Sequence, residues 1–210
     1  MRNIKLVAFD CDGVMFDTVA ANHAYYNDIL RFTGSPPLTP EQFEFAHMHT
    51  VDETLALLFR DNPEGLARAG VYRKTLSYLP FIKEMVIEPG LKPLLEKLRP
   101  LRKTAVATNR SDTMDRVLKE HGLEDAFDMV VTSLDVVHPK PHPESLIKIL
   151  DHFTLKPIEA IYIGDSKLDE MAAMGAKIPF VAYGNRSLSA VHHIDRLEEV
   201  MLLLDGWGEG

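Results

Sequence analysis

Short apolar runs recur along the chain and alternate with stretches whose apolar residues follow helical spacing. The apolar runs cover residues 4–9, 104–108, 129–132, 160–163 and 180–183, and they are rich in Val, Ile, Ala and Phe. They lack the strict alternation of half-exposed strands, as is typical of strands covered on both faces. Helical patterns lie between them at residues 91–99, 112–121, 144–153 and 169–174. This order predicts an α/β fold, a Rossmann-like three-layer structure with a parallel sheet as its core.

One long segment carries only helical patterns. They cover residues 19–32, 40–59 and 63–78, and the joints between them contain Gly34-Ser35-Pro36-Pro37 and Asp61-Asn62-Pro63. A plain crossover between parallel strands needs only about a dozen residues. A long crossover remains the alternative, but the length favours an inserted helical-bundle cap domain. We therefore expect a core domain of residues 1–16 and 87–210 and a cap domain of residues 17–86.

Composition and charge narrow the class of protein. The 210 residues include 31 acidic and 23 basic ones, for a net charge of -8, which argues against a nucleic-acid partner. The same charge is compatible with a small anionic substrate, because one local cation can outweigh it. A single cysteine excludes an intrachain disulfide and fits a reducing compartment. With neither a signal peptide nor a membrane-spanning run evident, we expect a cytoplasmic protein without a membrane or an evident protein partner.

Polar residues follow the predicted strands at their carboxyl ends. They are Asp10 and Asp12 after the first strand, Thr108 and Asn109 after the second, Lys140 in the Pro-rich loop after the third, and Asp165, Ser166 and Asp169 after the fourth. Ligands of open α/β sheets bind outside these strand ends. We therefore expect these side chains to meet in one site.

The residue types indicate phosphoryl chemistry. In an extended chain Asp10 and Asp12 point to the same side, and two such close charges require a cation or a shared proton. Mg²⁺ prefers a few carboxylates together with phosphate oxygens. Asp10 and Asp165 can hold it, and Asp169 can do so directly or through water. One carboxylate is then placed to attack phosphorus, while Asp12 can protonate the leaving oxygen.

The same motifs resemble those of the haloacid dehalogenase superfamily of phosphohydrolases. They are Asp10-Cys11-Asp12-Gly13-Val14, Thr108-Asn109, Lys140 in a Lys-Pro-x-Pro setting, and Gly164-Asp165-Ser166-x-x-Asp169. The resemblance implies that Asp10 is the nucleophile and Asp12 the acid and base. It also implies that Asp10, Asp165 and the backbone carbonyl of Asp12 bind Mg²⁺, with support from Asp169. Thr108 and Lys140 would bind the phosphoryl group, and Asn109 is a further candidate for that role.

The helical insert resembles the caps of phosphoglycolate phosphatases and β-phosphoglucomutases. In this segment His47 and His49 are the candidate substrate contacts, although two helical residues at this spacing do not share a face. Cys11 lies between the two carboxylates but points away from them along an extended chain, so we expect it only to pack.

These observations predict a Mg²⁺-dependent phosphatase that acts on a small phosphorylated metabolite through an aspartyl-phosphate intermediate. Phosphoglycolate and sugar phosphates are the leading substrates. The alternative is a sugar phosphomutase with the same nucleophile, which returns the phosphoryl group to sugar instead of water. A dehalogenase fits less well, because a halide leaving group needs no proton from Asp12. A non-catalytic binding module is disfavoured by the complete set of Asp10, Asp12, Lys140 and Asp165.

Overall fold

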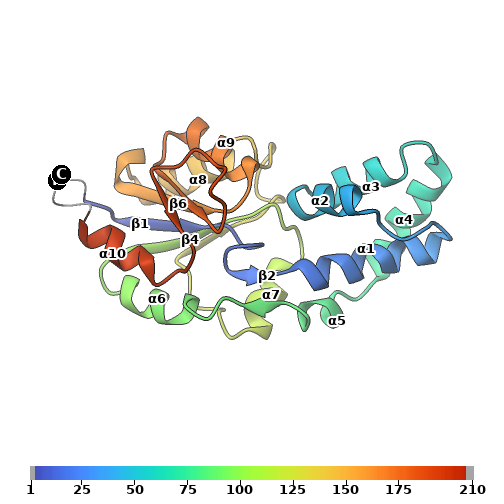
Figure 1. Cartoon of the computed structure of the whole chain (residues 1–210), viewed down its shortest axis with the longest axis horizontal. Helices are drawn as coiled ribbons and strands as arrows, with labels where there is room; N and C mark the ends of the chain where they lie inside the picture. Colours follow the sequence, from blue (N-terminus) through green and yellow to red (C-terminus); the bar gives the residue numbers. More distant parts are fainter. Residues whose placement is uncertain (1–2, 207–210) are drawn as a thin grey trace. The chain divides into compact units, whose positions relative to one another are not determined.

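The computed structural model describes residues 3–206, apart from the side chains of residues 47 and 48. The chain folds into two compact units (Figure 1). One combines Met1–Phe16 with Ile87–Gly210, and the other is Asp17–Val86. Two short strands, β2 (Phe16–Asp17) and β3 (Val86–Ile87), pair where the chain passes from one unit to the other. No helix in the described part of the chain is long and apolar enough to span a membrane.

The first unit is built on a parallel six-stranded sheet, which confirms the predicted α/β fold class. Its strands are β1 (Leu6–Phe9), β4 (Lys103–Ala107), β5 (Met129–Val131), β6 (Ala160–Gly164), β7 (Phe180–Tyr183) and β8 (His192–Ile194). Their order in space is β5-β4-β1-β6-β7-β8, and each pairing between neighbours is parallel. Phe9 lies opposite Val106 on one side and Ile163 on the other, so three strands end together. Strand β8 was not expected, because His192-His193-Ile194 carries no apolar run.

Helices cover both faces of this sheet (Figure 1). They are α6 (Leu91–Leu98), α7 (Met114–Glu120), α8 (Glu144–Phe153), α9 (Lys167–Ala176) and α10 (Glu199–Gly206), with a 3₁₀ turn at Pro157–Glu159. Helices α8 and α9 lie on one face, and α6, α7 and α10 lie on the other. On the α8 and α9 side, Leu6, Ala8 and Tyr162 from the strands pack with Leu146 and Ile149 of α8. Burial on both faces explains the nearly continuous apolar strand sequences.

The second unit is built from helices, with a residue of β2 and one of β3 at its two ends. The helices are α1 (Val19–Thr33), α2 (Pro40–Met48), α3 (Val51–Leu58), α4 (Pro63–Thr75) and α5 (Leu79–Ile82). Tyr25 of α1 contacts Tyr78 and Phe81 edge to face, with ring centroids 5.1 and 5.5 Å apart. The Tyr72 hydroxyl donates to Asp28 Oδ2 at 2.8 Å, which ties α4 to α1.

The expectation of one helix over residues 40–59 was wrong, because the chain breaks at His49 and Thr50. Both residues have extended backbone angles. Thr50 begins α3 with a capping box, in which its hydroxyl accepts the Glu53 N–H and the Glu53 carboxylate accepts the Thr50 N–H. The expected helix over residues 112–121 is also shorter, since α7 runs only from Met114 to Glu120.

Candidate active site

Asp10 directly follows β1 and is 7% exposed. Its Oδ1 accepts the Cys11 N–H at 2.7 Å and lies 2.8 Å from Lys140 Nζ. Both contacts reach the same oxygen, which fixes the rotation of the carboxylate. Burial raises the pKa of Asp10 well above its usual range, the nearby Asp169 and Asp165 charges raise it further, and the Lys140 ammonium opposes this. Asp10 is therefore a carboxylate that needs positive charge to stay ionised.

Lys140 provides part of that charge at a fixed position. Its Nζ lies 2.8 Å from Asp10 Oδ1, 2.6 Å from Asp169 Oδ1 and 3.0 Å from the Tyr162 hydroxyl. An ammonium has three N–H donors, so these partners match its full set. Burial alone would lower the pKa of Lys140, but the Asp10 and Asp169 carboxylates raise it above its usual value. Lys140 therefore carries a permanent positive charge between two carboxylates.

Asp169 lies in the first turn of α9 and is fully buried. Its Oδ2 accepts the N–H and the hydroxyl of Ser166, the N-cap residue of the helix. The Tyr162 hydroxyl lies 2.7 Å from Asp169 Oδ1. Burial alone would raise the pKa of Asp169, but the Lys140 charge and these hydrogen bonds hold it below its usual value. Both oxygens of Asp169 are thus engaged by protein groups.

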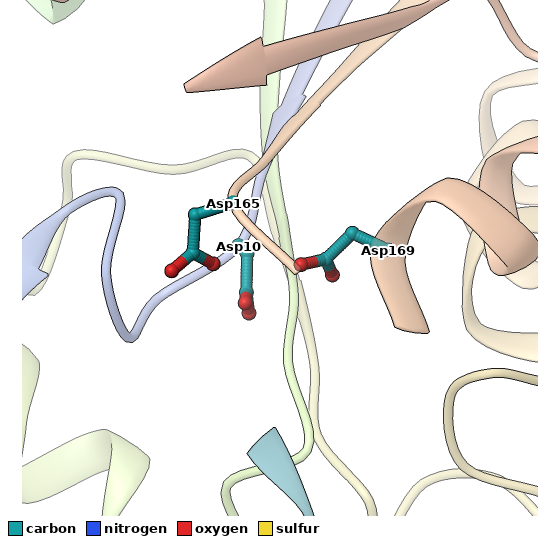
Figure 2. A group of neighbouring side chains, drawn as sticks. All are labelled: Asp10, Asp165 and Asp169. Atoms are coloured by element: carbon teal, nitrogen blue, oxygen red, sulfur yellow. The ribbon is translucent and has the colours of Figure 1, made fainter. Parts of the chain in front are cut away.

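Asp165 completes a group of three carboxylates with Asp10 and Asp169 (Figure 2). One oxygen from each lies within 4.8 Å of the others. Burial, followed by the charge of Asp169, raises the pKa of Asp165 to about 7. Gly13, at φ +78, passes so close that a Cβ there would lie 2.0 Å from Asp165 Oδ2. A residue other than glycine would therefore push the Asp165 carboxylate out of place.

This carboxylate group fits a hard divalent cation. Its oxygens are of the type and number that Mg²⁺ accepts from protein. Burial and the neighbouring carboxylates raise the pKa values of Asp10 and Asp165 although Lys140 lies beside them, and a bound cation would oppose this rise. Asp10 and Asp165 would hold the ion. Asp169 is bound to Lys140 and Ser166 and would add negative charge near the ion. The Asp12 side chain is outside this group, so any part it has in metal binding falls to its backbone carbonyl.

Thr108 and Asn109 follow β4 and have different surroundings. Thr108 is 3% exposed, and its Oγ1 accepts the Arg110 N–H at 3.1 Å, which leaves the hydroxyl hydrogen to donate elsewhere. The Asn109 side chain binds the backbone of Lys140, donating to its carbonyl at 3.0 Å and accepting its N–H at 3.0 Å. Asn109 therefore fixes the lysine loop, whereas the Thr108 hydroxyl accepts a backbone N–H of its own loop.

Asp12 makes an ion pair with Arg110. Its Oδ1 lies 2.7 Å from Arg110 Nη2 and 3.2 Å from Arg110 Nε. The two carboxylates that seemed crowded in the sequence are thus each matched with a different cation, Lys140 for Asp10 and Arg110 for Asp12.

Sequence reasoning missed two residues of this site, Arg110 and Tyr162. Arg110 directly follows the Thr108-Asn109 motif, so its place beside the strand end could have marked it as a candidate site residue. Tyr162 lies within an apolar strand and has the appearance of a core residue until its hydroxyl is located.

The two histidine candidates of the helical unit have different outcomes. His49 ends α2, where its Nδ1 lies 3.0 Å from the Phe45 carbonyl and its ring stacks on Phe45. The side chain of His47 lies outside the described part of the chain. Neither histidine is tested as a substrate contact.

Comparison with known proteins identifies the class. Residues 7–183 match the haloacid dehalogenase-like hydrolase family. The chain is 30% identical to a phosphoglycolate phosphatase from Rhodobacter capsulatus, covering 95% of this chain and 96% of the relative. It is 31% identical to the pyrophosphatase PpaX from Bacillus velezensis, covering 97% and 96%. A crystal structure of a HAD-superfamily hydrolase, subfamily IA, from Geobacter sulfurreducens is 38% identical, with a TM-score of 0.79 and 96% of each chain covered.

Fold, site and relatives together define an enzyme of the phosphatase class. The chain belongs to the haloacid dehalogenase-like hydrolase family, whose match spans most of its length.

Proposed function

We propose that this enzyme is a Mg²⁺-dependent phosphomonoester hydrolase that acts on a small phosphorylated metabolite through an aspartyl phosphate at Asp10. The observation that carries the proposal is the setting of Asp10: a buried carboxylate at a strand end, 2.8 Å from Lys140 Nζ and grouped with Asp165 and Asp169. A phosphoryl group brought there meets a nucleophile together with fixed positive charge. Positioning and charge neutralisation are the main requirements of phosphoryl transfer.

The proposed reaction has two steps. In the first, which starts with Asp12 in its protonated form, an oxygen of Asp10 attacks phosphorus, the bond to the leaving oxygen breaks, and the Asp12 carboxyl gives its proton to that oxygen and becomes a carboxylate. In the second, Asp12 takes a proton from a water molecule that attacks the aspartyl phosphate, and phosphate leaves. The Thr108 hydroxyl donates to a phosphoryl oxygen, and Lys140 does so by turning one N–H away from one of its three present partners. A bound Mg²⁺ would supply positive charge beside Asp10 and the phosphoryl oxygens.

We assign selection of the leaving group to the helical unit, Asp17–Val86, as a cap. Phosphoglycolate is the first substrate to test, because a relative 30% identical over nearly the whole chain is a phosphoglycolate phosphatase. Pyrophosphate is the second, because a relative of similar identity is a pyrophosphatase. A sugar phosphomutase is the remaining alternative.

A phosphatase screen with Mg²⁺ tests the proposal. The panel contains 2-phosphoglycolate, pyrophosphate and sugar phosphates, and Asp10→Asn serves as the blank. The proposal predicts release of phosphate that the blank lacks. Isomerisation of β-glucose 1-phosphate without free phosphate, in the presence of a sugar bisphosphate, would instead establish the phosphomutase. Equal phosphate release by wild type and Asp10→Asn would remove Asp10 as the nucleophile.

A further inference from the structure

Arg110 makes an ion pair with Asp12 that is largely removed from water. Arg110 Nη2 lies 2.7 Å and Nε 3.2 Å from Asp12 Oδ1, and the two side chains are 6% and 19% exposed. A guanidinium is rigid and planar, so two N–H groups directed at one oxygen restrict where that oxygen can lie. The pair therefore limits the rotation of the Asp12 carboxylate.

Arg110 is itself fixed at both ends, which lets it serve as a support. Its backbone N–H donates to Thr108 Oγ1 at 3.1 Å, and its carbonyl accepts from the Ser133 N–H at 2.9 Å and hydroxyl at 3.1 Å. At the other end, Nη1 donates to Thr113 Oγ1 at 3.3 Å. The guanidinium is thus tied to the loop that also carries Thr108.

The backbone of Asp12 is set by the turn after β1. The Gly13 N–H donates to the Phe16 carbonyl at 2.8 Å, and the Met15 N–H donates to the Cys11 carbonyl at 3.0 Å. These bonds fix the position of the Asp12 Cα but do not act on its side-chain torsions. The Arg110 guanidinium constrains those torsions by binding Asp12 Oδ1.

We propose that Arg110 is a positioning residue that orients the Asp12 carboxylate for proton transfer. This inference rests on the proposed function, in which Asp12 gives a proton to the leaving oxygen and later takes one from water. Proton transfer requires the donor within hydrogen-bond reach of its target, and small displacements are costly. Arg110 acts on the reaction only through Asp12.

Such a role predicts a dependence on the leaving group. An alkyl phosphate releases a strongly basic oxygen that needs a proton, whereas 4-nitrophenyl phosphate releases a stable anion without one. Loss of Arg110 should therefore slow transfer from the alkyl ester far more than from the aryl ester. A residue that only maintained the fold would slow both equally.

The experiment measures phosphoenzyme formation in single turnovers with Mg²⁺. It compares Arg110→Gln, Arg110→Lys and the control Arg116→Gln, an exposed arginine on α7. For Arg110→Gln we expect transfer from an alkyl phosphate to slow about 10- to 100-fold, and transfer from 4-nitrophenyl phosphate to slow less than about 3-fold. Arg110→Lys keeps the charge without the fork and should fall between wild type and Arg110→Gln. Arg116→Gln should match wild type.

A double-mutant cycle tests whether Arg110 acts through Asp12. In an Asp12→Asn background, adding Arg110→Gln should cause no further loss with the alkyl ester. Equal slowing of both esters, or the same loss in the Asp12→Asn background, would overturn the proposal. A wild-type protein that forms no phosphoenzyme from either ester would overturn the proposed function instead, and this inference with it.

Discussion

The Asn109 side-chain amide hydrogen-bonds to both the carbonyl and the N–H of the Lys140 backbone. Its Nδ2 donates to the Lys140 carbonyl at 3.0 Å, and its Oδ1 accepts the Lys140 N–H at 3.0 Å. Two loops far apart in the sequence are thereby locked together at the strand ends. The position of the Lys140 ammonium beside Asp10 depends on these two hydrogen bonds.

Replacing Asn109 should therefore impair catalysis without direct contact to substrate. Asn109→Ala removes both bonds, and we expect kcat/KM to fall about 10- to 100-fold because the ammonium is displaced from Asp10. Asn109→Asp keeps an oxygen that can accept the Lys140 N–H and should lose less. Steady-state kinetics measure both effects. An unchanged kcat/KM in Asn109→Ala would show that the two hydrogen bonds between Asn109 and Lys140 are not needed for catalysis.

Tyr162→Phe should disturb the same ammonium by removing one of its three partners. The Tyr162 hydroxyl accepts from Lys140 Nζ at 3.0 Å and lies 3.0 Å from the Ala107 carbonyl. Its loss leaves buried polar groups without a partner, so we expect the free energy of unfolding to fall by roughly 1–3 kcal/mol. We also expect kcat to fall by about tenfold.

Urea unfolding and kinetics check the Tyr162 prediction, with Tyr183→Phe as the matched control. The Tyr183 hydroxyl lies 3.4 Å from Glu88 and does not contact Lys140. The control should keep its kcat. An equal loss of kcat in both variants would contradict a specific role for Tyr162.

The sequence predicted that the candidate side chains of this site lie close together, because they follow strand ends. Asp10, Lys140 and Asp165 lie together where parallel strands finish, as spacing and strand pattern indicated. The division of labour between them could not be read from the sequence. Whether the Asn109 amide binds a ligand or the backbone of Lys140 depends on where two loops of the folded chain lie.

The misplaced helix boundaries have a different cause. Apolar spacing runs on through His49 and Thr50, so periodicity alone joined α2 and α3 into one helix. The capping pair of Thr50 and Glu53 was present in the sequence and outweighed the spacing. In the sheet, β8 contains two histidines and is held by pairing with β7, which an apolar pattern cannot reveal.

Removing one carboxylate should weaken metal binding. Asp165→Asn loses a charge beside Asp10, so we expect the Mg²⁺ concentration for half-maximal activity to rise by at least about tenfold. The increase in melting temperature on adding Mg²⁺ to EDTA-treated protein should also shrink in this variant. Asp151→Asn, an exposed change on α8, is the control and should behave as wild type. An identical Mg²⁺ response in Asp165→Asn would exclude Asp165 as a ligand.

Asp128 should contribute to stability in a pH-dependent way. Burial alone would raise the pKa of Asp128, but its bonds from Lys103 at 2.7 Å and the Thr104 N–H at 2.9 Å lower it below 3.8. A carboxyl with a lowered pKa in the folded state stabilises the protein above its unfolded pKa. That contribution is lost as the pH falls through the folded value.

Asp128→Asn should thus lower the free energy of unfolding at neutral pH by no more than about 1 kcal/mol, because water screens the half-exposed Lys103 pair. The gap from wild type should close below about pH 4. Denaturant unfolding across this range measures it, with the exposed Asp125→Asn as the control. A gap that stayed constant down to the lowest pH would contradict the assigned cause.

The central claim is that Asp10 carries the phosphoryl group. Its most direct test is acid quenching of wild type during turnover with Mg²⁺ and a labelled substrate, followed by peptide mapping of the label. The account predicts an acid-stable, hydroxylamine-sensitive phosphate on the peptide that contains Asp10, and none in Asp10→Asn. Turnover by wild type with no label on that peptide, together with activity retained in Asp10→Asn, would contradict it.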